Sequence, residues 1–378
     1  MVGIRRCGKS VILKQIIEEI KAEGVKDNHI LFINFEFIEY EELKDYKKLN
    51  TYVKNKIKDD KLYYLFFDEI QNVDKFELVI NSLRSSLDNV SIFITGSNSR
   101  LLSQELATDL SGRYVSFKIN PLNYKEFIEL TNQDAKDFSV FWNYVEWGGL
   151  PNRVKFNAED DLKLYLQSVF DSIILRDVIN RLKLNDTNLF VLILRYLVDT
   201  IGREFSAKNI VSFLKSEGRN VSTETIYIYL DALCKAFIVK KINRYDIHGR
   251  LILKTLNKYY LTDLGLVKIM NTSEVFNKSY ALENVVYNEL LVRGYEVYVG
   301  KTKSGEIDFV ANKYDKKIYI QVAVTALGDE KTREREFGAF EVIQDNYTKY
   351  VLTMDNVTED YKGIKHINII DFLLNDEF

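Results

Sequence analysis

The sequence predicts an α/β protein whose first part contains a parallel sheet, and three observations support this prediction. A glycine-rich loop at residues 3–10 runs directly into a pattern of apolar residues at helical spacing. Apolar runs at residues 30–37, 62–67 and 90–96 alternate with helical stretches, as the strands of a buried parallel sheet do. The second of these runs leads into two acidic residues, Asp68 and Glu69, which places carboxylates at the carboxyl edge of the sheet.

The loop satisfies the phosphate-binding pattern G-x-x-x-x-G-K-[ST], with the sequence Gly3-Ile4-Arg5-Arg6-Cys7-Gly8-Lys9-Ser10. Its two glycines let successive backbone N–H groups turn towards one anion, Lys9 can reach the β- and γ-phosphates, and the Ser10 hydroxyl can join a Mg²⁺ shell. The helix that follows, to about Gly24, adds the attraction of its dipole. The alternative is a glycine turn that opens an ordinary helix. We therefore expect ATP and Mg²⁺ as cofactors.

Only Met1 and Val2 precede this loop, although a phosphate loop normally follows a buried parallel strand. We therefore expect the first strand to be missing from the centre of the sheet. Two explanations are open: the start codon lies further upstream, or the sheet tolerates a gap. If the loop does not hold its shape without that strand, the chain is a non-hydrolysing binding module, which is the alternative to an ATPase.

The run at 62–67 followed by Asp68 and Glu69 is typical of a Walker B strand. In this interpretation Asp68 holds Mg²⁺ through water, and Glu69 polarises the water that attacks the γ-phosphate. A strand end followed by an N-capping acid is the alternative.

The run at 30–37 separates the loop from the Asp-Glu strand, an order typical of P-loop ATPases with a catalytic glutamate. In that order the strand at 90–96 lies between the strands of the loop and of Asp68, which leaves Asn98 near the γ-phosphate as a sensor. A turn or a helix cap is the alternative for Asn98. A further strand is expected at 115–119. Arg113, at its start, is a candidate arginine finger or subunit contact, and an ordinary surface arginine is the alternative.

These residues resemble a known family, the prokaryotic AAA-type ATPases known only as ATP-binding proteins. The resemblance covers the whole chain, and it is carried by the loop, by Leu-Phe-Phe-Asp-Glu-Ile-Gln ending at Gln71, by Thr-Gly-Ser-Asn-Ser at 95–99, and by Gly148-Gly149-Leu150-Pro151. It implies a C-terminal half of unknown function in which a winged helix precedes a restriction-endonuclease-like α/β domain. The expected domains are the ATPase core at 1–122, a helical lid at 123–190, the winged helix at 191–270 and the endonuclease-like domain at 271–378.

Residues 191–266 are expected to form three helices and a hairpin. The third helix, from Ser222, stands where a winged helix has its recognition element, but it carries Glu224 and Asp231, which suit a phosphate backbone poorly. The hairpin is basic, and its cations are Lys240, Lys241, Arg244, Arg250, Lys254 and Lys258. We expect either a basic wing that contacts DNA or RNA, or a solvated hairpin or protein-docking module.

The last part has the layout of a restriction-endonuclease-like core, with Glu283 on a helix and Asp308 on a strand. In active nucleases of that fold, two acids hold the metal and a lysine activates water. Here Gln321 and Ala323 stand at the positions of the second acid and the lysine. The sequence therefore favours a scaffold for nucleic acid or protein, with a vestigial site at Glu283, Asp308 and Gln321, over a metal-dependent nuclease.

The composition sets limits on partners and compartment. Fifty-two Lys and Arg against 55 Asp and Glu give a net charge of −3, so no overall charge drives the molecule onto nucleic acid or membrane. The two cysteines lie in different contexts, which favours a reducing compartment. Without a secretory signal or an apolar run of membrane length, a cytoplasmic protein with no membrane partner is expected. We predict an AAA-type, Mg²⁺-dependent ATPase that couples its nucleotide state to the C-terminal half, with an oligomer left open.

Overall fold

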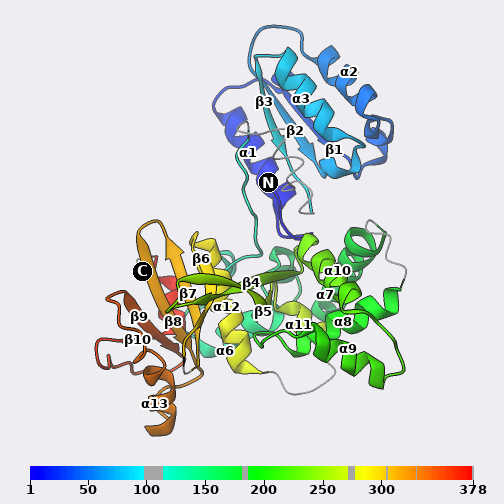
Figure 1. Cartoon of the computed structure of the whole chain (residues 1–378). Helices are drawn as coiled ribbons and strands as arrows, with labels where there is room; N and C mark the ends of the chain where they lie inside the picture. Colours follow the sequence, from blue (N-terminus) through cyan, green and yellow to red (C-terminus); the bar gives the residue numbers. More distant parts are fainter. Residues whose placement is uncertain (98–113, 181–185, 271–276, 304, 329, 377–378) are drawn as a thin grey trace. The chain divides into compact units, whose positions relative to one another are not determined.

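The computed structural model describes residues 1–97, 114–180, 186–270, 277–303, 305–328 and 330–376 (Figure 1). The chain divides into two compact units, one of Met1–Asn120 with Lys235–Phe237 and one of Pro121–Cys234 with Ile238–Phe378. The expected α/β class with a parallel sheet is confirmed. Asn98 and Arg113, expected as sensor and arginine finger, lie outside the described residues.

The first unit contains a parallel three-stranded sheet in the order β1 (Ile30–Asn34), β2 (Tyr63–Asp68) and β3 (Val90–Ile94). The central strand β2 is almost continuously apolar because it is paired on both edges, and Leu65, Phe66 and Phe67 are fully buried. Since all three strands are parallel, their carboxyl ends meet at one edge of the sheet. Asn34 at the end of β1 stands opposite Asp68 at the end of β2.

Among the described residues of this unit, three helices accompany the sheet: α1 (Lys9–Ala22), α2 (Tyr46–Lys56) and α3 (Phe76–Ser86). In α1 the apolar residues recur every three or four positions, so Leu13, Ile17 and Ile20 form one stripe that packs with Phe66 of β2. The 3₁₀ turns are η1 (Asp27–His29), η2 (Ile38–Lys44) and η3 (Ile70–Asn72). Helix α1 therefore runs beside the sheet and begins where the glycine-rich loop ends.

The strand expected at residues 115–119 does not form. This segment makes a single isolated parallel bridge, between Lys118 and Val2, and Val2 makes a second bridge to Gly96 after β3. A strand needs a neighbour that forms hydrogen bonds along its length. Among the described residues, Val2 forms a β-bridge to this segment at one position, Lys118, so no ladder develops. Residues 114–119 are therefore extended but not part of a ladder.

The second unit begins with helices: α5 (Tyr124–Thr131), α6 (Phe138–Trp147), the turn η5 (Pro151–Lys155), α7 (Glu159–Ser172) and the π-helical η6 (Ile173–Asn180). A capping box between Asn123 and Glu126 starts α5. Then come α8 (Thr187–Asp199), α9 (Ala207–Ser216), α10 (Thr223–Lys235) and α11 (Gly265–Met270). Within the described ranges no helix is both long and apolar enough to cross a bilayer.

A seven-stranded mixed sheet completes this unit, in the order β10-β9-β8-β7-β6-β4-β5. Its strands are β4 (Val239–Asp246), β5 (Leu251–Leu261), β6 (Glu296–Lys301), β7 (Glu306–Lys313), β8 (Lys316–Val322), β9 (Thr348–Thr353) and β10 (Lys365–Asn368). The three helices and the hairpin expected at residues 191–266 are present as α8, α9, α10 and the hairpin of β4 and β5. However, the end of the first hairpin strand, at Arg244–Asp246, pairs in parallel with β6, so the hairpin shares one sheet with the C-terminal strands.

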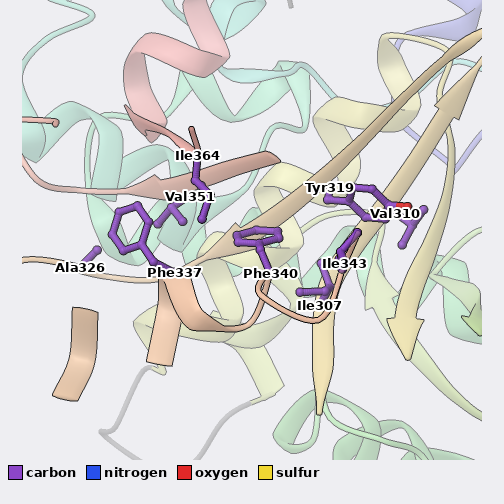
Figure 2. Close-up of a cluster of buried hydrophobic side chains, with 9 residues drawn as sticks. All are labelled: Ile307, Val310, Tyr319, Ala326, Phe337, Phe340, Ile343, Val351 and Ile364. Atoms are coloured by element: carbon purple, nitrogen blue, oxygen red, sulfur yellow. The ribbon is translucent and has the colours of Figure 1, made fainter. Parts of the chain in front are cut away.

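The core of the C-terminal part lies between this sheet and the segment around α13 (Glu330–Gly338). Figure 2 shows nine buried side chains that form it: Ile307, Val310, Tyr319, Ala326, Phe337, Phe340, Ile343, Val351 and Ile364. Helices α12 (Lys278–Val292) and α14 (Ile369–Leu374) complete the unit. Because these apolar side chains are buried together, they fix the positions of β7 and β8. These two strands carry Asp308 and Gln321.

Candidate functional site

The glycine-rich loop forms a tight bend that ends at the first residue of α1. Arg6 (φ 69°) and Gly8 (φ 106°) both have left-handed backbone conformations, which let the chain reverse within a few residues. A Cβ atom at Gly3 would lie 2.0 Å from the carbonyl oxygen of Ile119, so only glycine fits there. The first N–H groups of α1 have no partner within the helix, and they face the loop with the positive end of its dipole.

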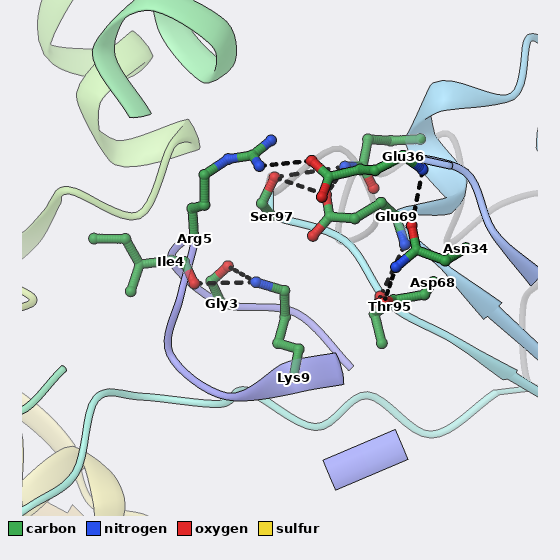
Figure 3. Close-up of polar contacts among 11 residues, drawn as sticks. Gly3, Ile4, Arg5, Lys9, Asn34, Glu36, Asp68, Glu69, Thr95 and Ser97 are labelled. Carbon is green, nitrogen blue, oxygen red and sulfur yellow. Dashed lines mark hydrogen bonds and ion pairs between the residues drawn. The ribbon is translucent and has the colours of Figure 1, made fainter. Parts of the chain in front are cut away.

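Lys9 lies folded against its own loop. Its ammonium donates hydrogen bonds to the carbonyl oxygens of Gly3 and Ile4, both at 3.0 Å, and its side chain is buried (Figure 3). These are the bonds of a cation to neutral acceptors. A phosphate group would offer the same ammonium a stronger, charge-assisted bond.

An ion pair links the loop to the end of β1. The guanidinium of Arg5 is 2.7 Å from a carboxylate oxygen of Glu36, and the Arg5 side chain is buried (Figure 3). The loop therefore contacts the carboxyl edge of the sheet.

Asp68 ends β2 with a completely buried carboxylate that accepts one hydrogen bond on each oxygen. The Thr95 hydroxyl donates to Oδ1 at 2.5 Å, and the Asn34 amide donates to Oδ2 at 2.9 Å. Hydrogen bonds to a charged group stabilise it by about 1.5–3 kcal/mol each. Both donors are neutral, so they fix the direction of the carboxylate without cancelling its charge.

Glu69 follows with an unusual backbone and a fixed side chain. Its φ is 55°, a left-handed conformation that is costly for a residue with a Cβ. The backbone N–H donates to the Thr95 hydroxyl at 3.0 Å, and the carboxylate accepts hydrogen bonds from Ser97, at 3.1 Å, and Gln71. The strained turn, the bond of the backbone N–H to Thr95 and the two neutral donors to the carboxylate therefore hold Glu69 beside Asp68.

Cys7 lies in the same loop with a buried thiol. Burial is the main cause that raises its pKa, and Glu69 adds to it, whereas Lys9 and backbone N–H groups oppose it. The thiol therefore stays protonated and fills space under the loop.

The structure brings Glu283 of α12 and Asp308 of β7 into one buried region, and a lysine that sequence reasoning did not place there lies beside Glu283. The Lys258 ammonium, on β5, is 3.8 Å from Glu283 and 2.5 Å from Glu306. Lys258 and Glu283 are buried, whereas Glu306 is partly exposed. Gln321 of β8 accepts a hydrogen bond from the Asp308 backbone N–H at 3.3 Å, and Asp308 accepts one from the Val322 N–H at 2.8 Å. A built-in cation thus balances these carboxylates.

Three of the basic residues expected on the hairpin are internal. Lys240 donates to Asn288, Arg244 pairs with Glu204 and Glu306, and Lys258 pairs as described above. Their side chains are buried, so their charges are not presented to a phosphate backbone. Among the hairpin cations whose side chains are described, Lys241 and Arg250 are exposed.

Sequence reasoning assigned no role to the residues that orient the acids, Asn34, Thr95, Gln71 and Ser97, or to Glu36, which pairs with Arg5. One signal could have found two of them, because Asn34 and Thr95 are the first polar residues after apolar strands and parallel strands end at a common edge. The contacts of Glu36, Gln71 and Ser97 depend on how turns fold after the strands; Gln71 and Ser97 lie in the stretches that carry the family resemblance, but these stretches did not indicate the contacts.

The loop at a helix N-terminus and the buried Asp68 and Glu69 at the end of a parallel strand define the class of an AAA-type, P-loop ATPase-like domain. In agreement, residues 1–128 match the AAA domain family, and residues 139–275 match DUF8612, a domain of unknown function.

Two relatives match almost the whole chain. An uncharacterized protein of Haemophilus influenzae is 40% identical over 379 residues, which cover 98% of this chain and 93% of that protein. Uncharacterized protein MJ1544 of Methanocaldococcus jannaschii is 33% identical over 396 residues, which cover 98% and 83%. A Walker-type ATPase of Pyrococcus abyssi matches in structure with a TM-score of 0.45 and 15% identity, over 71% of this chain and 89% of that one. The chain belongs to the family of these two uncharacterized proteins.

The buried carboxylates of the second unit generate a pH-dependent prediction. Burial is the main cause that raises the pKa of Asp308, to about 7, and Lys258 opposes it. Unfolded aspartates titrate near about 3.9, so the folded state binds this proton more tightly. The stabilisation is complete below about pH 4 and is lost as the pH rises to about 7. In urea titrations, the free energy of unfolding of the wild type, relative to that of Asp308→Asn, should fall as the pH rises from about 4 to about 7.

Asp315→Asn is the matched control, because Asp315 is exposed in the turn after β7. Its difference from wild type should stay flat with pH. A flat difference for Asp308→Asn as well would show that this carboxyl titrates normally in the folded protein.

Proposed function

We propose that the N-terminal unit binds Mg²⁺-ATP and hydrolyses it. The single observation that carries this proposal is the arrangement at the edge of the sheet: Lys9 and the loop N–H groups stand at the start of α1, and Arg5 links the loop to β1, next to the strand that ends in Asp68 and Glu69. A phosphate-binding loop and two oriented carboxylates are the parts that phosphoryl transfer to water requires.

In this proposal the loop from Gly3 to Ser10 holds the phosphates. Backbone N–H groups of the loop bind the bridging and β-phosphate oxygens, and Lys9 exchanges its two carbonyl acceptors for phosphate oxygens. Arg6 is an exposed residue of the loop, where it adds positive charge. The exchange at Lys9 gains more than it loses, because two neutral acceptors are replaced by charged ones.

Ser10 and Asp68 would hold Mg²⁺ together with phosphate oxygens and waters. Magnesium is usually bound by one or two carboxylates and keeps several waters, and Asp68 suits this role because each of its oxygens accepts only one of the hydrogen bonds described above. When bound, the ion neutralises phosphate charge.

Glu69 is the proposed general base. Its carboxylate would accept a proton from a water placed in line with the γ-phosphate, and Ser97 and Gln71 fix the direction in which it points. We also propose Asn98 as the sensor and Arg113 as the arginine finger; both residues lie outside the part of the chain that the structure describes. The non-hydrolysing alternative differs in one respect: the loop would bind nucleotide without positioning the water.

For the second unit we propose a binding module for nucleic acid or protein that responds to the nucleotide, with residues 123–190 as a lid and 191–270 as a winged helix. Nuclease activity is not part of the proposal. Lys258 already pairs with Glu283 and Glu306, and Gln321 lacks the charge of the second acid. With three hairpin cations internal, a protein surface is as suitable a partner as a phosphate backbone.

The proposal predicts that Lys9→Ala weakens binding of a fluorescent ATP analogue by about 10–100-fold, because a charge-assisted phosphate contact is lost. Lys14→Ala is the matched control, since Lys14 is exposed on the same helix and should leave the affinity unchanged. Fluorescence titration with Mg²⁺ measures both. Equal affinities in the two variants would contradict the role of the loop.

Glu69→Gln should separate binding from hydrolysis. The amide cannot accept a proton, so we expect the rate of phosphate release to fall by about 10²–10⁴-fold while nucleotide affinity stays near wild type. Phosphate release and fluorescence titration on the same preparation measure the two quantities. Wild-type chain that binds ATP yet releases no phosphate would support the non-hydrolysing module.

Thr95→Val should reduce hydrolysis although Thr95 touches neither ATP nor water in the proposal. The valine keeps the shape but removes the donor to Asp68 and the acceptor for the Glu69 N–H. Loss of such an orienting partner typically costs about 10–100-fold in metal affinity or activity. Thr95→Ser keeps the hydroxyl and should recover most of the rate. A serine variant as slow as the valine variant would indicate a packing role only.

A further inference from the structure

A cavity of about 670 Å³ lies in the helical part of the second unit. Residues of α5, α6, η5 and the first turn of α7 line it, together with residues that join these elements. The lining is more polar than apolar, and it includes the side-chain amides of Gln133, Asn143 and Asn157. Pockets for small molecules usually measure about 300–1,000 Å³. The cavity is therefore large enough for a small ligand, and it offers hydrogen-bonding groups.

One of the residues that line this cavity, Arg153 of η5, is a buried cation. Only 4% of it is exposed, and it forms no ion pair with a carboxylate of the described residues. Its guanidinium donates instead to the carbonyl oxygens of Gly148 and Asn143 and to Asn143 Oδ1. Its Cζ atom lies 4.7 Å from the centre of the Phe127 ring. These partners are neutral, so they fix the guanidinium without matching its charge.

The charges around Arg153 compensate only part of the cost of its burial. Burial is the main cause that lowers the pKa of its guanidinium to about 10, and the nearby carboxylate of Asp263 opposes this shift. The oxygens of Asp263 accept hydrogen bonds from the backbone N–H groups of Gly149, at 2.7 Å, and Gly265, at 2.9 Å. The carboxyl end of α6 adds a partial negative charge. Neither is the direct partner that a buried arginine usually has.

Arg153 and Asn143 retain hydrogen-bond donors. A guanidinium has five N–H donors, and the three hydrogen bonds described above leave two of them. The amide oxygen of Asn143 accepts from Arg153, so its NH₂ group remains as a donor beside the guanidinium. Both residues line the cavity, so a ligand there can reach these donors. A carboxylate matches them, because its two oxygens accept parallel bonds from a guanidinium.

We propose that this cavity binds a polar small molecule with a single carboxylate, and that Arg153 and Asn143 hold that carboxylate. The lining limits the ligand to one negative charge: Arg153 is its only cation, and Glu159 is an exposed acid in it. A phosphate group carries a charge of about −1.5 to −2, which one cation near an acid matches poorly. The amides of Gln133 and Asn157 suit uncharged polar groups elsewhere on the ligand. This site is independent of the proposed ATPase activity.

The test uses the tryptophan fluorescence of the full chain without nucleotide. The two tryptophans of the chain, Trp142 and Trp147, both lie on α6, and Trp147 lines the cavity. The probes are N-acetylglycine, which has one carboxylate, and its uncharged amide, N-acetylglycinamide, at constant ionic strength. We expect N-acetylglycine to bind saturably and the amide to bind at least about 10-fold more weakly, because it makes no charge-assisted bond. Equal binding of the two probes, or no saturable binding of N-acetylglycine, would overturn the proposal.

Variants on opposite sides of the charge balance locate the probe. Arg153→Lys should weaken N-acetylglycine binding at least about 10-fold, because an ammonium lacks the planar fork. Glu159→Gln does not disturb the buried arginine, and loss of this exposed acid should strengthen binding about 2–5-fold. Asp160→Asn is the matched control: Asp160 is exposed on the same helical turn but does not line the cavity, so its effect should be smaller.

Two further results would contradict the proposal. If Glu159→Gln binds N-acetylglycine no more tightly than Asp160→Asn does, the carboxylate does not lie in this cavity. If inorganic phosphate binds more tightly than N-acetylglycine and Arg153→Lys abolishes this binding, the ligand is a phosphate and not a carboxylate. Circular dichroism of each variant shows whether its helices have formed.

Discussion

The phosphate loop depends on the hydrogen bonds of two residues, Met1 and Val2. The Val2 N–H donates to Phe117 at 2.9 Å, the Ile119 N–H donates to Val2 at 2.7 Å, and Gly96 bonds to Met1. These bonds hold the first residues between the end of β3 and residues 117–119, and Gly3 follows so closely against Ile119 that no side chain fits. The direction in which the loop leaves the sheet, and therefore the place of Lys9 at the start of α1, is set by this short stretch of backbone.

The two units stabilise buried carboxylates in opposite ways. In the first unit Asp68 and Glu69 accept hydrogen bonds from neutral donors, which are the side chains of Asn34, Thr95, Ser97 and Gln71. In the second unit Lys258 supplies a positive charge beside Glu283 and Glu306, and Arg244 adds another beside Glu306. Neutral donors orient a carboxylate and leave its charge for a cation, whereas an internal cation consumes that charge. For the proposed function, this difference favours the acids of the first unit as the place of metal-assisted chemistry.

Local patterns were enough to predict the sheet of the first unit and its two acids. The loop motif, the apolar run before Asp68 and the polar residues after each strand all act over a few residues, and the observed strands β1, β2 and β3 fall within one residue of their expected starts. The strand expected at 115–119 was wrong because pairing depends on a neighbour that sequence spacing does not reveal. The burial of Lys240, Arg244 and Lys258 was missed for a similar reason: a basic hairpin looks the same in sequence whether its cations face solvent or the acids of β7 and α12.

The outer edge of β3 and the acids at the end of β2 are connected through Thr95. Thr95 follows β3 directly, its hydroxyl donates to Asp68 and accepts from the Glu69 N–H, and its carbonyl accepts from the Ile70 N–H at 3.1 Å. Its neighbours Ile94 and Gly96 make the bonds to Met1. A shift of β3 relative to β2 therefore moves the donor that orients Asp68 and the partner of the Glu69 backbone together. The pairing of β3 and the geometry of the acids are therefore coupled, and the loop, which follows Met1 and Val2, is coupled to both.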